Sequence, residues 1–342
     1  MKKLSLLMLL LLLAAPAALG ETVAMTFVGD CTLGCDVDWL KDERAFTNVI
    51  DREGFDYPFA LVRDAFLRDD LTVVNLEGVL ADSDEDIMGG RKYNFRGPTA
   101  YAQILSRAGV ELATLGNNHI KDFGKAGLES TIQALEAAGV GYAFTEDAFI
   151  FEKDGIRIGV LSFISNVFDR YQKQLPSIIA ALREDEGCAA VVLCLHAGVE
   201  YSLHSGREQK RYARRAIDAG VDLVIGHHPH VLQGLDVYKG RNIVYSLGNF
   251  CFGGNRRILA EQSHSMAVRV EMAFDDGVYA AQRLTILPAI NTGTYDRNNY
   301  QPYWATGEQA QEVMAILQAD TPYELLPYEE GAGAVQAWLM AE

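Results

Sequence analysis

Residues 221–230 read VDLVIGHHPH and join a short apolar run to three closely spaced histidines. The run VDLVI is apolar and β-branched, which is typical of a buried strand. The whole chain has only 7 histidines, so this clustering at an expected strand end needs an explanation. Two interpretations are open, a metal site and a polar loop that is rich in one residue.

On both sides of this stretch, apolar strand patterns alternate with helical patterns. Strands are expected at 22–29, 71–77, 110–116, 156–165, 189–197, 221–226 and 242–248. Helices are expected at 57–70, 98–109, 124–139 and 205–220. Strands separated by helices of this length indicate βαβ units and a largely parallel sheet, so we expect an α/β fold.

The alternation changes late in the chain. The runs 266–274 and 278–287 flank Asp-Asp-Gly at 275–277 and predict a hairpin, which makes the sheet arrangement mixed. Residues 293–342 are polar, with one helical stretch at 306–318, and are expected to form an appendage packed on the core. We find no repeat or low-complexity linker, so residues 21–292 are interpreted as one domain.

The composition is that of a globular protein and argues against nucleic-acid binding. The 342 residues are 49% hydrophobic and 22% charged, an ordinary mixture for a folded chain. The formal net charge is −16, whereas a surface that binds phosphate backbones needs Lys and Arg. We therefore expect no nucleic acid among the partners.

The N-terminus has the pattern of a secretory signal. Lys2 and Lys3 precede an apolar run at 4–15, and the small residues ALG stand at 18–20. The alternative is an uncleaved anchor, but a spanning helix needs about 20 apolar residues and this run meets Pro16. We expect residues 1–20 to be a signal peptide cleaved near Gly20, and the protein to be exported, extracellular or at the cell surface.

The cysteines do not indicate a disulfide scaffold. There are 5, so at least one is unpaired within the chain. Cys194 and Cys251 lie in or beside strand-like runs and are expected to be buried free thiols. Cys31 and Cys35 are a candidate pair, although nothing in the sequence requires it.

Polar residues that can bind metals stand where five expected strands end. They are Asp30, then Asn75 and Glu77, then Asn117, Asn118 and His119, then His196, and finally His227, His228 and His230. Sites in α/β sheets form at the carboxyl ends of strands, so these residues are expected to meet. Imidazole, carboxylate and amide oxygen together suit Zn, Mn or Fe, and a two-metal centre needs a bridging carboxylate. His204 and His264 lack such a context and are interpreted as structural.

The stretch GHHPH also suggests which histidines act together. Pro229 fixes its own φ and biases His228 toward an extended conformation. In an extended segment, residues i and i+2 project to the same side. We therefore predict that His228 and His230 are metal ligands and that His227 points away from the site.

Arg96 is a candidate for binding the substrate. It lies in YNFRGP, a Gly-Pro loop before an expected helix and between two of the motif-bearing strands. Its planar fork suits a phosphate or a carboxylate, and the alternative is a solvated loop arginine.

Six motifs resemble, in order and spacing, those of the CapA family. They are GDCTLG (29–34), NLEG (75–78), FRGP (95–98), LGNNHIKDFGKAGLEST (115–131), HAGVEY (196–201) and GHHPHVLQGLDVYKGRNIVYSLGNF (226–250). The family comprises poly-γ-glutamate capsule biosynthesis proteins with a calcineurin-like metallophosphoesterase fold. The resemblance runs from about residue 23 to 290. It implies a four-layer αββα sandwich of two mixed sheets.

The resemblance also implies roles for individual residues. Asp30 and His230 would hold one metal, Asn118, His196 and His228 the second, and Glu77 would bridge the two, with His119 stabilising or protonating the leaving oxygen. Three positions depart from the wider metallophosphoesterase pattern. The usual Asp-x-His is here Asp30-Cys31-Thr32, the bridge is Glu rather than Asp, and Ala197 replaces a tryptophan. Glu200 keeps its place and is expected to orient a ligand histidine.

These roles imply a metal-dependent hydrolase or transferase with two divalent ions of Mn, Fe or Zn. The catalytic residues would be His119, Asp30 and Glu77, and the substrate-binding residues Arg96, Asn75 and Asn117. The family implies poly-γ-glutamate or a phosphorylated small molecule as substrate, and other capsule synthesis proteins at the membrane as partners. The alternative is a non-catalytic surface component of a capsule export or anchoring complex, which the missing Asp-x-His histidine favours.

Overall fold

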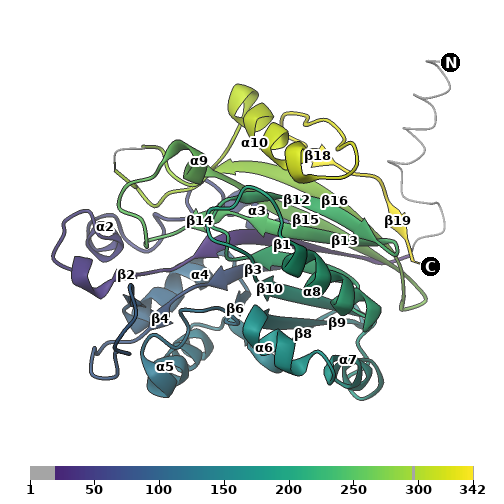
Figure 1. The fold of residues 1–342 in the computed structure, drawn as a ribbon, viewed down its shortest axis with the longest axis horizontal. Helices are drawn as coiled ribbons and strands as arrows, with labels where there is room; N and C mark the ends of the chain where they lie inside the picture. Colours follow the sequence, from purple (N-terminus) through teal and green to yellow (C-terminus); the bar gives the residue numbers. More distant parts are fainter. Residues whose placement is uncertain (1–19, 295–296, 342) are drawn as a thin grey trace.

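The computed structural model describes residues 20–294 and 297–341 (Figure 1). The expected signal segment at 1–20 lies outside the described residues except for Gly20. Among the described residues, no helix is long and apolar enough to cross a membrane.

The first sheet is mixed and contains the N-terminal strand. Its strands run in the order β17 (Tyr303–Trp304), β16 (Val278–Ile290), β15 (His264–Asp275), β1 (Thr22–Cys31), β3 (Leu71–Leu76), β6 (Leu112–Thr114) and β7 (Gly141–Ala143). β14 (Asn249–Cys251) pairs with β1, and β18 (Ala334–Val335) and β19 (Leu339–Met340) pair with β16. β1, β3, β6 and β7 are parallel, and β15 and β16 form the predicted antiparallel hairpin.

The second sheet is also mixed. Its order is β12 (Leu232–Tyr238), β13 (Arg241–Leu247), β11 (Leu223–His227), β10 (Ala190–His196), β9 (Ile156–Ile164) and β8 (Thr145–Lys153). The four central strands are parallel, and β12 and β8 are antiparallel edges. The chain passes from this sheet to the first at Gly248, the one residue between β13 and β14. A small third sheet has the order β2 (Cys35–Asp36), β5 (Phe95–Gly97) and β4 (Val79–Leu80).

One buried cluster contains apolar side chains from both large sheets. Met25 and Phe27 of β1 belong to it together with Val160 of β9 and Val192 of β10. Fully burying a side chain of this size stabilises the fold by about 1.5–3 kcal/mol. The two sheets therefore share a core.

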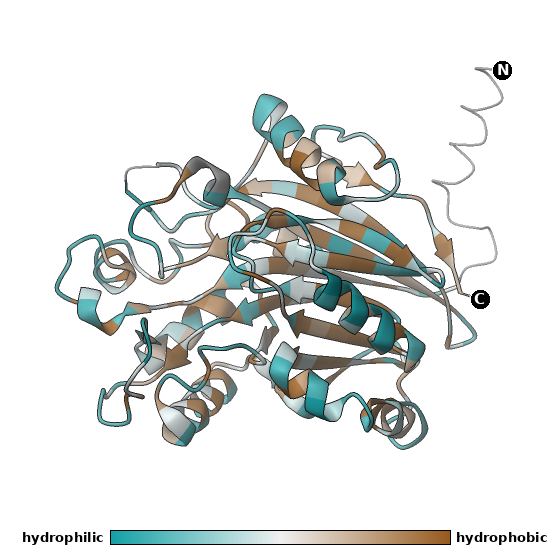
Figure 2. Cartoon of the chain, viewed as in Figure 1, coloured by the Kyte–Doolittle hydropathy of each residue, from teal (hydrophilic) through white to brown (hydrophobic). Residues whose placement is uncertain are grey.

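The helices bury their apolar faces in two further clusters. α2 (Phe46–Glu53), α4 (Ala102–Ala108) and α5 (Gly124–Ala137) contribute to a cluster with first-sheet residues such as Val74. α6 (Ser165–Tyr171), α7 (Leu175–Glu184) and α8 (Arg207–Asp218) contribute to one with second-sheet residues such as Leu193. Figure 2 shows the result for α8, whose visible surface is largely hydrophilic beside hydrophobic strands.

The remaining helices are short, or belong to the C-terminal segment. They are α3 (Arg63–Phe66), α9 (Ala260–Ser263), α10 (Gly307–Asp320) and the 3₁₀ turns at Val37–Trp39 and Thr99–Tyr101. Leu317 of α10 joins the core between the sheets, and β17, β18 and β19 extend the first sheet. The described residues of the C-terminal segment thus contribute to the core and extend the first sheet, and the domain division at residue 292 stays a prediction.

The α/β class predicted from the sequence is confirmed, but the helix predicted over 57–70 is wrong. Most of that segment forms turns, and only Arg63–Phe66 is α-helical. Its large aromatic residues explain the difference, because Phe59 and Phe66 are both buried and pack against Phe250 of β14. Tertiary packing has overridden the local helical pattern.

Candidate metal centre

The polar ends of five strands meet at one place. Asp30 at the end of β1, Glu77 after β3 and Asn118 after β6 come from the first sheet. His196 ends β10 and the GHHPH loop follows β11, both in the second sheet. Three groups of side chains there could each hold an ion: Glu77, His196 and His228; Asp30, Glu77 and His230; and Glu200, His228 and His230.

Glu77 lies at the centre of this arrangement and belongs to two of the three groups. It is fully buried, and neither carboxylate oxygen has a hydrogen-bond partner. Its Oε1 lies 3.6 Å from Nε2 of His196 and 3.7 Å from Nε2 of His230. Burial raises the pKa of Glu77 well above its usual value, because a buried carboxylate needs a compensating positive charge. A carboxylate in this position fits a bridge between two cations.

One set of possible ligand atoms surrounds His196. Its Nε2 lies 2.6 Å from Oδ1 of Asn118 and 3.0 Å from Nδ1 of His228. Burial lowers the pKa of His196 well below its usual value, and burial together with His230 lowers that of His228 to about 4. Both imidazoles are therefore neutral at physiological pH, which is the form that binds metal.

Asp30 is held in place by three side chains. Its Oδ1 accepts hydrogen bonds from Nδ2 of Asn75 at 2.8 Å and from Nδ1 of His227 at 3.0 Å, and its Oδ2 lies 3.3 Å from Nδ1 of His230. Burial favours the protonated acid, but the hydrogen bonds of His227 and His230 outweigh it and lower the pKa of Asp30 well below its usual value. Asp30 is thus an ionised potential ligand.

His230 lies between two carboxylates. Burial opposes its charge, but Glu77 and Asp30 outweigh burial and raise the pKa of His230 to about 10. Its Nδ1 also lies 2.9 Å from Oδ1 of Asn249, a fully buried residue of β14. With its Nδ1–H donated to this oxygen, His230 presents Nε2 toward Glu77.

The structure corrects the prediction for the GHHPH loop. His228 has φ 102° and His230 φ 60°, so neither is extended. These left-handed conformations are uncommon for residues other than glycine and mark a constrained loop. His227 is buried and faces Asp30, and it does not point away as predicted. His227 is nevertheless absent from the three possible ligand groups among the described residues.

His119 lies beside the cluster in the loop after β6. Its Nδ1 lies 2.7 Å from Oδ2 of Asp122, which is fully buried and also accepts from the amide of Phe95. This contact holds the proton of the neutral imidazole on Nδ1 and leaves Nε2 available. Within the described part of the chain, Nε2 of His119 has no hydrogen-bond partner.

Three residues predicted to bind substrate are engaged inside the protein. Nδ2 of Asn75 donates to Asp30, while Asn117 donates to Leu76 and accepts from two backbone amides. Arg96 donates to Asp84 at 2.6 Å and to the carbonyl oxygen of Ala81 at 2.7 Å. These contacts give all three residues internal partners, and their substrate-binding roles stay predictions.

The contacts of Glu200 fit its expected position at the edge of the centre. This exposed residue has a carboxylate oxygen near ring nitrogens of His228 and His230. It could orient a histidine, as the sequence suggests, or bind an ion directly.

Two glycines let the backbone fit closely at the site. A Cβ on Gly116, the residue before Asn117, would lie 2.5 Å from the carbonyl oxygen of Ser162 in the opposite sheet. One on Gly226, the residue before His227, would lie 2.1 Å from that of Tyr245. Only glycine permits such an approach, so both glycines help to place the residues that follow them.

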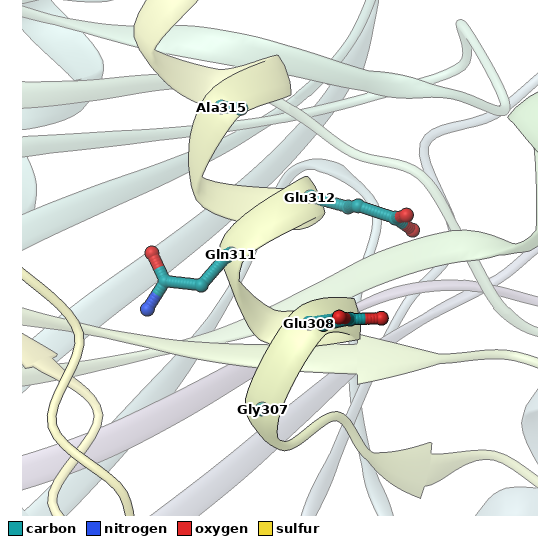
Figure 3. Close-up of a pocket in the computed structure, with 5 residues that line it drawn as sticks. All are labelled: Gly307, Glu308, Gln311, Glu312 and Ala315. Carbon is teal, nitrogen blue, oxygen red and sulfur yellow. The ribbon is translucent and has the colours of Figure 1, made fainter.

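Two histidines and two surface hollows lie apart from the three possible ligand groups. His204 and His264 contact Asp320 and Glu312. A hollow of about 640 Å³ lies on α10, where Glu308 and Glu312 project to one side (Figure 3); its lining residues are Gly307, Glu308, Gln311, Glu312 and Ala315. A larger one of about 800 Å³ lies against β15, β16 and the C-terminal segment. Neither is lined by a histidine.

The cysteines contribute no ligand to the three groups and are all free and buried. This confirms the free thiols expected at Cys194 and Cys251, and Cys31 and Cys35 are not paired.

Sequence reasoning missed Asp122, Asn249 and Arg91, which all contact residues of the site. Asp122 follows His119 by three positions and Asn249 lies in SLGNF, so both stand in quoted motifs. Their roles depend on loop geometry, and the sequence carried no signal for Arg91.

Comparisons with known proteins place the chain in a family. Residues 24–254 match the model of a family described as bacterial capsule synthesis protein PGA_cap. The chain belongs to this family. A capsule biosynthesis protein CapA of Bacillus anthracis is 30% identical over 256 residues, which cover 68% of this chain and 60% of the relative. The PGA biosynthesis protein CapA of Bacillus subtilis (strain 168) is 28% identical over 251 residues, which cover 68% and 64%.

More distant similarities also exist. A probable polyglutamine synthesis accessory protein of Mycobacterium tuberculosis is 24% identical over 209 residues, which cover 53% of this chain and 55% of that protein. The matched part of the chain covers 60% and 64% of the length of the two Bacillus relatives. A hypothetical protein from Thermus thermophilus aligns with a TM-score of 0.45 and 15% identity over 78% of this chain and 99% of the other, which is too distant to indicate function.

Proposed function

We propose that this CapA-family protein is an exported, metal-dependent hydrolase or transferase of the metallophosphoesterase type that acts in poly-γ-glutamate capsule synthesis. The names of its relatives support the capsule role. The proposal includes the four-layer αββα arrangement, which the three buried clusters support. It also includes the signal peptide and partners among capsule synthesis proteins at the membrane.

The buried carboxylate of Glu77, which has no hydrogen-bond partner, is the observation that carries the proposal. A fully buried carboxylate without a hydrogen-bond partner is costly unless a cation compensates its charge. The donors around it are imidazole, carboxylate and amide oxygen, a set that suits Zn, Mn or Fe. One ion would be held by Asn118, His196 and His228. The other would be held by Asp30 and His230, and Glu77 would contact both ions.

The remaining residues of the site have separate tasks. Bound ions would supply Lewis-acid polarisation of a phosphoryl or acyl oxygen. His227 and Asn75 hold Asp30 by hydrogen bonds. Asp122 fixes the ring of His119, whose Nε2 can donate a proton to a leaving oxygen when the ring is doubly protonated.

The competing function is a non-catalytic component of a capsule export or anchoring complex. The residues after Asp30 favour it, because Cys31 and Thr32 replace the expected histidine ligand. Oγ1 of Thr32 donates to the carbonyl oxygen of Gly34 and accepts from the amide of Gly253, and Sγ of Cys31 lies 3.5 Å from the carbonyl oxygen of Gly29. One ion position therefore has fewer protein ligands than the other.

Metal analysis of the purified protein tests the proposal. We expect about two divalent ions per chain, and loss of both in Glu77→Gln, which keeps the shape of the side chain and removes its charge. Circular dichroism of the variant would check that it folds. A wild-type protein that binds no metal after incubation with Mn²⁺, Zn²⁺ or Fe²⁺ would contradict the enzyme and favour the complex component.

A further inference from the structure

Arg91 lies in the loop between β4 and β5 and reaches the residues that flank His119. Its Nη1 donates to the carbonyl oxygen of Asn118 at 2.7 Å and to Oδ1 of Asp122 at 2.8 Å. Asn118 and His119 are neighbours, and Asp122 is the residue that holds the ring of His119. Two contacts through a single nitrogen therefore fix the guanidinium next to the candidate proton donor.

The rest of this guanidinium is available. The Arg91 side chain is 35% exposed, and its Nε and Nη2 make no hydrogen bond to any described residue. The contact with the buried Asp122 uses only Nη1, so neutralising that carboxylate does not occupy the other donors. Here the anchored nitrogen orients the whole planar group, so the free donors have a fixed direction.

Arg96 provides a contrast five positions along the chain. Its side chain is 12% exposed, its Nε donates to Asp84 and its Nη1 to Ala81. Arg96 is therefore occupied by its own loop, whereas Arg91 is anchored to the residues of the site.

Charge and shape around Arg91 favour an anionic ligand. The nearby centre carries the carboxyl groups of Asp30, Glu77 and Glu200, which would repel an anion. A guanidinium at the side of His119 opposes that repulsion and matches the two oxygens of a phosphate or carboxylate. Tyr93 stacks on Phe95, whose ring centroid lies 4.3 Å from that of His119, so the rings two and four positions after Arg91 lie beside the histidine.

We propose that Arg91 binds an oxyanion of the substrate, a phosphate or a carboxylate, beside His119. This inference rests on the proposed function, because it gives that site a substrate class. Arg91 then acts as a binding residue that orients the anion, and His119 acts on the bond next to it.

Binding of inorganic phosphate, measured by isothermal titration calorimetry, tests this assignment. It is measured on the full chain as purified and after saturation with Mn²⁺, for wild type, Arg91→Ala and Arg91→Lys. We expect Arg91→Ala to weaken phosphate binding about tenfold or more, which corresponds to about 1.4 kcal/mol. Arg91→Lys should recover part of the affinity, because lysine keeps the charge without the fork. Metal content should be unchanged in both.

Two matched controls separate this role from general loss of charge. Arg68→Ala and Arg107→Ala each remove an exposed arginine outside the site. Both should bind phosphate within about twofold of wild type. A γ-linked glutamate oligomer in place of phosphate shows which oxyanion is preferred.

The assignment is overturned if Arg91→Ala and wild type bind both probes equally, or if wild type binds neither probe with or without metal. Loss of metal from Arg91→Ala would also overturn it, because the role would then be structural. A wild type without metal would contradict the proposed function, yet the comparison of Arg91 variants would still decide this inference.

Discussion

Nδ1 of His227 lies 3.0 Å from Oδ1 of Asp30, so two residues 197 positions apart form a buried pair at the junction of the two sheets. The pair gives His227 a different role from its neighbours His228 and His230. His227 holds a potential ligand in place and does not itself belong to a ligand group among the described residues.

This arrangement predicts graded effects of three substitutions. His228→Ala and His230→Ala should each lose bound metal, because each removes a ligand. His227→Ala should keep metal with about 10- to 100-fold weaker affinity, the usual effect of removing a residue that orients a ligand. Metal stoichiometry and competition with a chelator measure both effects. If His227→Ala emptied the site while His228→Ala retained it, the ligand assignment would be wrong.

Asp122→Asn should separate proton transfer from metal binding. The variant keeps the size of the side chain but weakens the contact that fixes His119. We expect unchanged metal content and a fall of about 10²- to 10⁴-fold in kcat on an aryl phosphate ester. The loss should shrink for an ester with a good leaving group, which needs little protonation. A structural role alone would predict equal losses for both esters.

Metal binding should release protons, and metal affinity should rise with pH. In the metal-free protein burial raises the pKa of Glu77, and Glu77 and Asp30 overcome burial to raise that of His230 to about 10. His230 thus holds a proton at pH 7 that a metal must displace, and the raised pKa of Glu77 shifts that carboxyl toward its protonated form. Raising the pH from 6 toward 9 relieves this competition. Calorimetry in buffers of different ionisation enthalpy should detect about one to two protons released per chain at pH 7. Affinity that is independent of pH would contradict these protonation states.

Gly116→Ala should destabilise the fold. The new Cβ would lie 2.5 Å from the carbonyl oxygen of Ser162, a backbone atom of the opposite sheet that cannot easily move. We expect a loss of about 1–3 kcal/mol in the free energy of unfolding, measured with urea. Gly89→Ala is the matched control, because its Cβ meets no atom within 4 Å. Equal stability of the two variants would show that the sheets can separate without cost at this point.

The sequence predicted the parts of the fold and site that depend on local pattern. Polar residues at strand ends were expected to meet, and Asp30, Glu77, Asn118, His196 and His230 do meet, although they come from two sheets. The antiparallel pairing of β15 and β16 confirms the hairpin predicted around 275–277, and Asp-Asp-Gly suits its turn. Predicting these features requires only the strand period, the residues of the turn and the direction of the strands.

The features that were missed depend on contacts between distant residues. The segment 57–70 has a helical pattern, yet burial of Phe59 and Phe66 against β14 produces turns. His228 has φ 102° although Pro229 biases it toward an extended conformation, and its ring contacts His196, which is distant in the sequence. Likewise, Arg91 and Arg96 cannot be told apart until their partners are known.

The ligand groups contain residues from both sheets, so a bound ion would connect the two sheets directly. Glu77 and Asn118 come from one sheet and His196 and His228 from the other, while Gly248 is the one residue that carries the chain from β13 to β14. Ions bound there would cross-link the two sheets and resist their separation. Chelation should then speed global unfolding and amide hydrogen exchange throughout both sheets, well beyond the loops that touch the ions.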